Sequence, residues 1–255
     1  MRQFTHLSAL SLLCFLGSHV QAQPVACVAG EVCITGKIAS ASTVEPTALD
    51  GTERCPGFPV DVTAGTADER RLACSAAGDA LKLLGRCSIT LVRPLHVQIM
   101  SEVRHPFSGA IFGLFDVNQE RVLVTKESNI SALVEDTPYA RLPQRDFYRS
   151  LIVHEVVHGV MHQNLKRKAA THAAYEYPAY ALQIESLPPH VREMFLHSFD
   201  GNALKSNTLF NDAVLFFDPF FFAARAYHHF KSAPEACAHL TGLLAGEVAF
   251  IAPPM

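Results

Sequence analysis

Two histidines and a glutamate stand at a spacing that suits metal chemistry, in the segment His154-Glu155-Val156-Val157-His158. Residues four apart on a helix share one face, with about 5–6 Å between their Cβ atoms, so the two imidazoles can converge on one ion. Glu155 then lies beside the ion, where its carboxylate can take a proton from a water molecule. The spacing therefore predicts His154 and His158 as zinc ligands and Glu155 as a general base.

The residues around this motif predict a helix that is buried on nearly all sides. Apolar residues cover both of its faces: Phe147, Leu151, Val157 and Met161 beside the histidines, and Ile152, Val153, Val156 and Val160 opposite them. Burying polar groups in such a helix is unfavourable unless they are paired or bound to a metal. The competing interpretation is a core helix whose two histidines are hydrogen-bonded and bind no metal.

A catalytic zinc usually takes three protein ligands and keeps one position for water. Glu176 is the first candidate for the third ligand, because it follows His158 by 18 positions, on the next predicted helix. A short turn would bring that helix back beside the histidines. His172 and Glu185 remain as alternatives, and we expect His162, one turn beyond the pair, to be a neighbour of the site.

With this spacing the sequence resembles the gluzincins, zinc peptidases of the thermolysin-like and aminopeptidase-like type. In that family the H-E-x-x-H motif is followed by a glutamate ligand on the next helix. The resemblance implies one Zn²⁺ held by His154, His158 and Glu176, with Glu155 as the base that activates water for peptide hydrolysis. It follows the order of elements over residues 58–185, although only the motif and Glu176 are specific. The chain is also similar to small secreted bacterial proteins without a characterised activity.

Hydrolysis also needs a hydrogen-bond donor for the oxyanion, besides the metal. The candidates on the helical side are Tyr180, Tyr227, His228 and His229. Of these, we predict Tyr180 and His228 as catalytic residues. Tyr180 also occupies the position where thermolysin-like enzymes carry an aspartate that orients a histidine. The alternative for all four is an ordinary core or surface role.

The N-terminus predicts export. A short positive start, an apolar run too brief to span a bilayer, and the small-residue site Val20-Gln21-Ala22 indicate a signal peptide over residues 1–22. The mature protein is then secreted or periplasmic and keeps six cysteines, so disulfides are expected. All 15 pairings are formally open. Cys27 with Cys33 and Cys74 with Cys87 are the local pairs to test first.

Charge and hydropathy exclude two classes of partner. Only Arg2 is charged within residues 1–22, so 20 basic and 24 acidic residues remain after cleavage, and no basic face favours nucleic acid. The phenylalanine-rich stretch 210–230 is interrupted by charges and proline before any run could cross a membrane. We therefore expect no stable membrane insertion, and a peptide or protein as the substrate. The oligomeric state stays open.

The order of elements predicts an α+β fold. Residues 23–56 read as an irregular segment held by disulfides, and residues 57–255 as one domain, with the sheet and active helix in 57–163 and a helical part in 164–255. The expected elements are a strand at 58–63, a helix at 66–85 ended by a left-handed Gly85, a β-rich stretch at 88–101 broken at Pro94, a hairpin of 110–115 with 121–125, the histidine helix, and helices at 169–187, 190–199, 219–230 and 234–246. The gluzincin resemblance implies a zincin-like arrangement, with a mixed sheet and backing helix before the active helix.

Together these observations predict a secreted or periplasmic zinc peptidase. One alternative is a catalytically inactive zincin-like protein that binds zinc or a partner, and another is a metal-free structural protein. The strand at 110–115 is expected either to pair with an extended peptide substrate or to be an ordinary edge strand. Pro178 requires the helix that carries Glu176 to start or bend there.

Overall fold

The computed structural model describes residues 51–105, 109–166, 171–201, 210–233 and 235–248. The predicted signal peptide, the candidate pairing of Cys27 with Cys33 and most of the segment 23–56 lie outside this range. The elements are β1 (Thr52–Arg54), β2 (Val60–Thr63), α1 (Ala67–Gly85), β3 (Leu95–Met100), β4 (Val103–His105), β5 (Gly109–Ile111), β6 (Gly113–Asp116), β7 (Arg121–Thr125), the 3₁₀ turn η1 (Glu127–Asn129), α2 (Ser131–Val134), the 3₁₀ turn η2 (Pro138–Arg141), α3 (Gln144–Asn164), α4 (His172–Ser186), α5 (Pro189–Leu196), α7 (Asp212–Phe217), α8 (Pro219–Ser232) and α9 (Ala236–Ala245).

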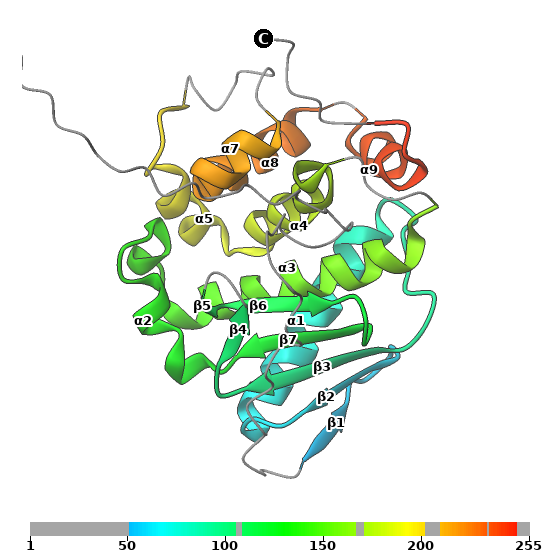
Figure 1. The fold of residues 1–255 in the computed structure, drawn as a ribbon, viewed down its shortest axis with the longest axis vertical. Coiled ribbons are helices and arrows are strands. Elements are labelled where there is room, and N and C mark those ends of the chain that lie inside the picture. The colour runs from blue at the N-terminus through cyan, green and yellow to red at the C-terminus, as the bar shows by residue number, and fades with distance from the viewer. Residues whose placement is uncertain (1–50, 106–108, 167–170, 202–209, 234, 249–255) are drawn as a thin grey trace, which may run out of the picture. The chain divides into compact units, whose positions relative to one another are not determined.

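Five strands form a mixed sheet in the order β1-β2-β3-β7-β6 (Figure 1). The three central strands run parallel, whereas the outer strands β1 and β6 are antiparallel to their neighbours. Valines at alternate positions, such as Val60 and Val62 of β2 and Val122 and Val124 of β7, are fully buried. β-Branched side chains suit a pleated surface of this kind. The α+β class with a mixed sheet is therefore confirmed.

Helices α1 and α3 pack against the sheet and against each other (Figure 1). α1 begins with the expected capping box, in which Thr66 and Glu69 each accept a hydrogen bond from the other's backbone N–H. The expectation of a left-handed Gly85 is wrong, because the helix runs through Gly85 and ends at a right-handed Arg86. The left-handed residue is Ser88, with φ of 58°, in the turn that leaves the helix.

The C-terminal part is helical, as expected. α4 lies between α3 and α8 (Figure 1). Thr171 caps α4 by accepting the N–H of Ala174, and the helix continues through Pro178. The helix therefore does not start at the proline, because the cap seven residues upstream fixes its beginning instead.

The strand expected at 110–115 is divided in two. Its first half, β5, pairs with β4 in a separate two-stranded sheet, and its second half, β6, forms the expected hairpin with β7. Phe112 separates the halves, and its carbonyl still accepts a hydrogen bond from Thr125. β6 is thus an edge strand of the main sheet. Pro94 directly precedes β3, which agrees with a break in the β-rich stretch.

Two disulfides are present in the described residues. Cys55–Cys74 ties the segment after β1 to α1, and Cys87–Cys237 ties the end of α1 to α9. The pair Cys74–Cys87, one of the two to be tested first, does not form, because Cys74 pairs with Cys55 and Cys87 with Cys237. A helix rises about 1.5 Å per residue, so α1 holds these two cysteines on the order of 20 Å apart, far beyond disulfide reach. Two disulfides fit an oxidising compartment outside the cytosol. No helix in the described residues has the length and hydropathy needed to cross a membrane.

Candidate metal centre

Helix α3 carries the histidine motif into the protein interior. Its neighbours in the chain are apolar, so the helix is buried from Leu151 to Met161. His154, Glu155 and His158 are buried with it, at 7%, 5% and 4% exposure. These are polar side chains in an apolar layer, and each needs a partner to offset its lost hydration.

Helix α4 brings Glu176 to the two histidines. The carboxylate oxygens of Glu176 lie 3.3 Å from His154 Nε2 and 3.4 Å from His158 Nε2. The two Nε2 atoms are 3.1 Å apart. These three residues form a group of side chains that could hold a metal ion. Glu176 is 26% exposed, so solvent reaches the group from its side.

The separations of the donor atoms match a four-coordinate site. Zinc binds imidazole nitrogen and carboxylate oxygen at about 2.0–2.1 Å, which for a tetrahedron gives about 3.3 Å between donors. The three observed separations, 3.1, 3.3 and 3.4 Å, lie close to this value. Three donors leave a fourth position for water. The donor set therefore fits a catalytic type of metal site.

Gln183 favours the histidine tautomer that a metal requires. His154 Nδ1 lies 3.0 Å from Oε1 of Gln183, which is 2% exposed. With this oxygen as acceptor, Nδ1 carries the proton and Nε2 presents its lone pair to Glu176 and His158. A lone pair facing a carboxylate is repulsive unless a proton or a metal cation lies between them. The hydrogen bond to Gln183 thus favours a cation at the centre of the group.

Two tyrosines of α4 fix the imidazole rings. Tyr175 stacks on His158, with ring centroids 4.4 Å apart and 14° between the planes. Tyr180 meets His154 edge to face at 4.6 Å. Burial raises the pKa of Tyr180 well above its ordinary value, and the negative charges of Glu176, then of other groups including Glu155, add to the rise. The hydroxyl of Tyr180 is therefore a proton donor at neutral pH, within the field of both carboxylates.

Strand β6 lies against Glu155. The backbone N–H of Phe115 donates to the Glu155 carboxylate. A Cβ atom added at Gly113 would lie 2.8 Å from Glu155 Cγ and 3.0 Å from the carbonyl oxygen of Leu123, so this position admits only glycine without movement. The edge strand and the proposed base are thus in direct contact.

The carboxylates of Glu155 and Glu176 have opposite pKa shifts. Burial raises the pKa of Glu155 to about 7, against the attraction of His154 and with the repulsion of Glu176. Burial would also raise the pKa of Glu176, but attraction to His158 and hydrogen bonds to both histidines hold it well below its ordinary value. At neutral pH, Glu176 is therefore anionic, as a metal ligand would need to be, while Glu155 can exchange a proton.

The alternative ligands make other contacts. Glu185 pairs with three cations, Arg86, Arg192 and Lys231. His172, at the first turn of α4, is not part of the metal-type group found in the described residues. His162 lies beside Glu120 and against the ring of Phe115. His162 is thus placed next to the edge strand and not on the ligand group.

Tyr180 is the only one of the four oxyanion candidates with a recorded contact to the histidine pair in the described residues. His229 Nδ1 lies 2.7 Å from the hydroxyl of Tyr177, in a separate aromatic cluster. Tyr227 packs under the guanidinium of Arg192, and His228 packs beside Tyr227. The structure therefore does not bring His228 together with the predicted site residues.

Sequence reasoning missed Gln183. The signal was present, since Gln183 follows Glu176 by seven positions and so lies on the same face of α4 two turns further on. The resemblance to thermolysin-like enzymes implies that the residue orienting a histidine stands at position 180. In this chain, the contact with His154 Nδ1 is made one turn later.

The fold and the site define an α+β protein with a group of two buried histidines and a partly buried glutamate. The chain belongs to the family of unknown function DUF6639, whose model matches residues 60–253 and so includes every residue of this group. No curated protein and no solved structure gives a significant match.

Proposed function

We propose that this protein is a zinc-dependent peptidase of gluzincin type that acts outside the cytosol. The observation that carries the proposal is the convergence of His154, His158 and Glu176 at donor separations of 3.1–3.4 Å, with Glu155 buried beside them. Two neutral imidazoles and one carboxylate are a common ligand set of hydrolytic zinc. Burial and the Gln183 contact argue against the metal-free alternative.

When bound by these ligands, zinc supplies a Lewis acid that lowers the pKa of a water molecule to about 7. Glu155 takes the proton from the attacking water and passes it to the departing amine. In the metal-free structure burial raises the pKa of Glu155 to about 7, so the surroundings of this carboxylate favour uptake of a proton. The Tyr180 hydroxyl, which stays protonated, donates a hydrogen bond to the oxyanion.

The edge strand supports an extended peptide as substrate. The carbonyl of Phe112 bonds toward β7, while the N–H of Phe115 bonds toward Glu155. Backbone groups at Phe112, just before β6, and at Phe115 within it therefore point to opposite sides, toward the sheet and toward the site. A peptide added at this edge would form backbone hydrogen bonds beside Glu155.

Glu155→Gln tests the proposal. We expect the zinc-loaded variant to keep one zinc per chain, because no ligand changes, and to lose at least about 10²-fold in the hydrolysis of a quenched-fluorescence peptide library. Metal content is measured by plasma mass spectrometry after purification without added zinc. Glu193→Gln, on the exposed face of α5, removes an equal charge and serves as the matched control.

Three outcomes would contradict parts of the proposal. Full activity in Glu155→Gln would refute the role of the base. A tightly held zinc without cleavage of any peptide would favour a non-catalytic zinc- or partner-binding protein. Purified protein that binds no zinc, and whose stability is unchanged in His154→Ala, would identify the histidines as core residues.

A further inference from the structure

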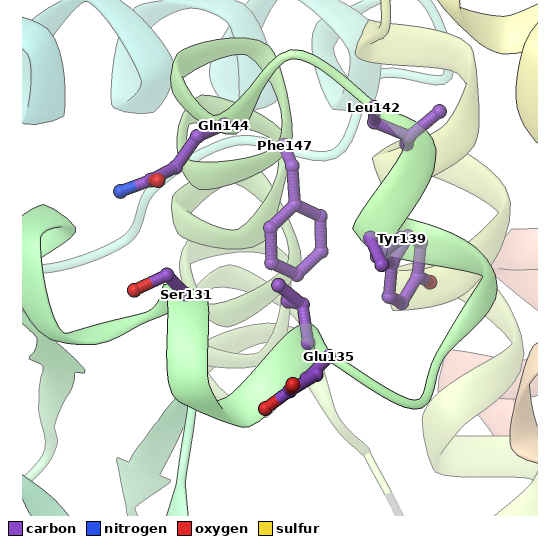
Figure 2. A pocket seen from close by; sticks show the side chains of 8 residues that line it. Ser131, Glu135, Tyr139, Leu142, Gln144 and Phe147 are labelled. Atoms are coloured by element: carbon purple, nitrogen blue, oxygen red, sulfur yellow. The ribbon is translucent and has the colours of Figure 1, made fainter.

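A cavity of about 330 Å³ lies beside the first turns of α3, between that helix, α2 and η2 (Figure 2). Its volume is near the lower end of the range for ligand sites. The cavity wall includes the apolar side chains of Val134, Leu142 and Phe147 and the ring of Tyr139. Figure 2 shows Phe147 projecting from α3 and Glu135 across the cavity from the start of that helix.

One side of the cavity wall is a tightly packed stack of aromatic rings. The Tyr139 ring is stacked between Phe147 and Phe195, with centroid distances of 4.4 and 5.1 Å. Phe147 and Tyr139 are 1% and 4% exposed. A stack of three aromatic rings keeps its shape without a ligand, so little ordering is required when a side chain enters.

The cavity lies on the same side of α3 as the candidate metal ligands. Phe147 precedes His154 by seven residues, which is two helical turns and about 10 Å along the axis. Phe112 packs edge to face on Phe147 at 5.4 Å, and the next residue, Gly113, abuts Glu155. The edge strand thus connects the cavity to the metal site.

The groups that line the cavity suit a long side chain that ends in a positive charge. Its lining combines apolar side chains with the polar side chains of Ser131 and Gln144 and the carboxylate of Glu135. Asp136 is the exposed neighbour of Glu135 in the sequence. No ion pair of Glu135 is found within the described part of the chain. A lysine or arginine can lay its aliphatic stem on the wall and keep its charge at the rim.

We infer that this cavity is a specificity pocket for a lysine or arginine of the peptide substrate. The inference rests on the proposed peptidase function. An extended peptide advances about 3.3 Å per residue, so a distance of about 10 Å places the basic residue roughly three positions from the cleaved bond.

The test uses a set of peptides that carry one arginine at successive positions, each paired with the same peptide carrying glutamine there. Cleavage sites are identified by mass spectrometry. We expect arginine to raise kcat/KM over glutamine by roughly fivefold when it lies two to four residues from the cleaved bond. Glu135→Gln should remove most of this ratio, whereas the matched control Asp136→Asn should keep it, because Asp136 does not line the cavity.

A binding assay separates this inference from the proposed function. Fluorescence anisotropy of the same peptides on zinc-loaded Glu155→Gln, with and without Glu135→Gln, reports the pocket without turnover. Cleavage without a preference for arginine would refute the specificity pocket but would agree with the proposed peptidase function. The protein could instead bind arginine peptides preferentially, in a way that depends on Glu135, and yet cleave no peptide. This result would support the pocket and refute the peptidase function. The pocket would also be refuted if Glu135→Gln and Asp136→Asn reduced the preference for arginine equally, or if neither assay showed a preference for arginine.

Discussion

At the scale of residues, the contact between Gln183 and His154 distinguishes this site from a bare H-E-x-x-H motif. Gln183 is uncharged, whereas a carboxylate in the same place would increase the basicity of the imidazole. The amide therefore sets the tautomer and orientation of His154 without adding charge to a centre that already contains two carboxylates, Glu155 and Glu176.

Gln183→Leu should weaken zinc binding by about 10- to 100-fold, because His154 loses the acceptor that holds its Nδ1 proton. Competition with a fluorescent zinc chelator measures the affinity. Gln183→Glu should restore binding, since a carboxylate also accepts this proton. An unchanged affinity in Gln183→Leu, at unchanged melting temperature, would show that Gln183 has only a packing role.

Glu155 predicts how the stability of the metal-free protein depends on pH. Because burial raises the pKa of Glu155 from its ordinary 4.5 to about 7, the folded state binds more protons than the unfolded chain between these values. The contribution of Glu155 to stability is therefore full below pH 4.5 and is lost as the pH rises through about 7. The loss is on the order of 3 kcal/mol.

Urea unfolding of the chelator-treated protein at pH 5, 6, 7 and 8 measures this loss. Glu155→Gln does not titrate, so the difference in stability between the variant and the parent should grow toward pH 8. Parallel profiles would contradict the raised pKa. The contribution of Glu176 to stability depends on pH in the opposite direction. Because its pKa is lowered, this contribution is lost only as the pH falls below 4.5.

At the scale of elements, short-range sequence patterns predicted most of the helices that position the site. Apolar residues on both faces of the motif predicted the buried α3, the Thr66–Glu69 box predicted the start of α1, and Asp218-Pro219 predicted that of α8. These features depend on residues within a few positions of one another. The placement of Glu176 beside the histidines also agrees with the sequence-based prediction, because a short connection between helices α3 and α4 favours antiparallel packing.

Features that depend on tertiary contacts were harder to predict. The division at Phe112 follows from β5 pairing with β4 instead of β7, which no local pattern indicates. The pairing of Cys87 depends on where α9 packs, 150 residues further along the chain. The use of Gln183 instead of residue 180 depends on the rotation of α4 about its axis, which is set by its packing against α3 and α8.

At the scale of the whole molecule, the two disulfides should contribute unequally to stability. Cys87–Cys237 closes 150 residues and Cys55–Cys74 closes 19. Chain entropy then gives stabilisation of about 5 and about 3 kcal/mol, respectively. Denaturant unfolding of the paired serine variants Cys87→Ser/Cys237→Ser and Cys55→Ser/Cys74→Ser measures both. A larger loss from the short loop would contradict this order.

The separation of Cys87 from Cys237 also constrains how the chain matures. Cys55 and Cys74 can be oxidised as soon as the first third of the protein has emerged, but Cys87 must wait for a partner near the C-terminus. During that interval its thiol is available for mispairing with the cysteines that precede it. Correct maturation should therefore depend on a thiol–disulfide isomerase, and molecules truncated before residue 237 should retain a reactive Cys87 thiol.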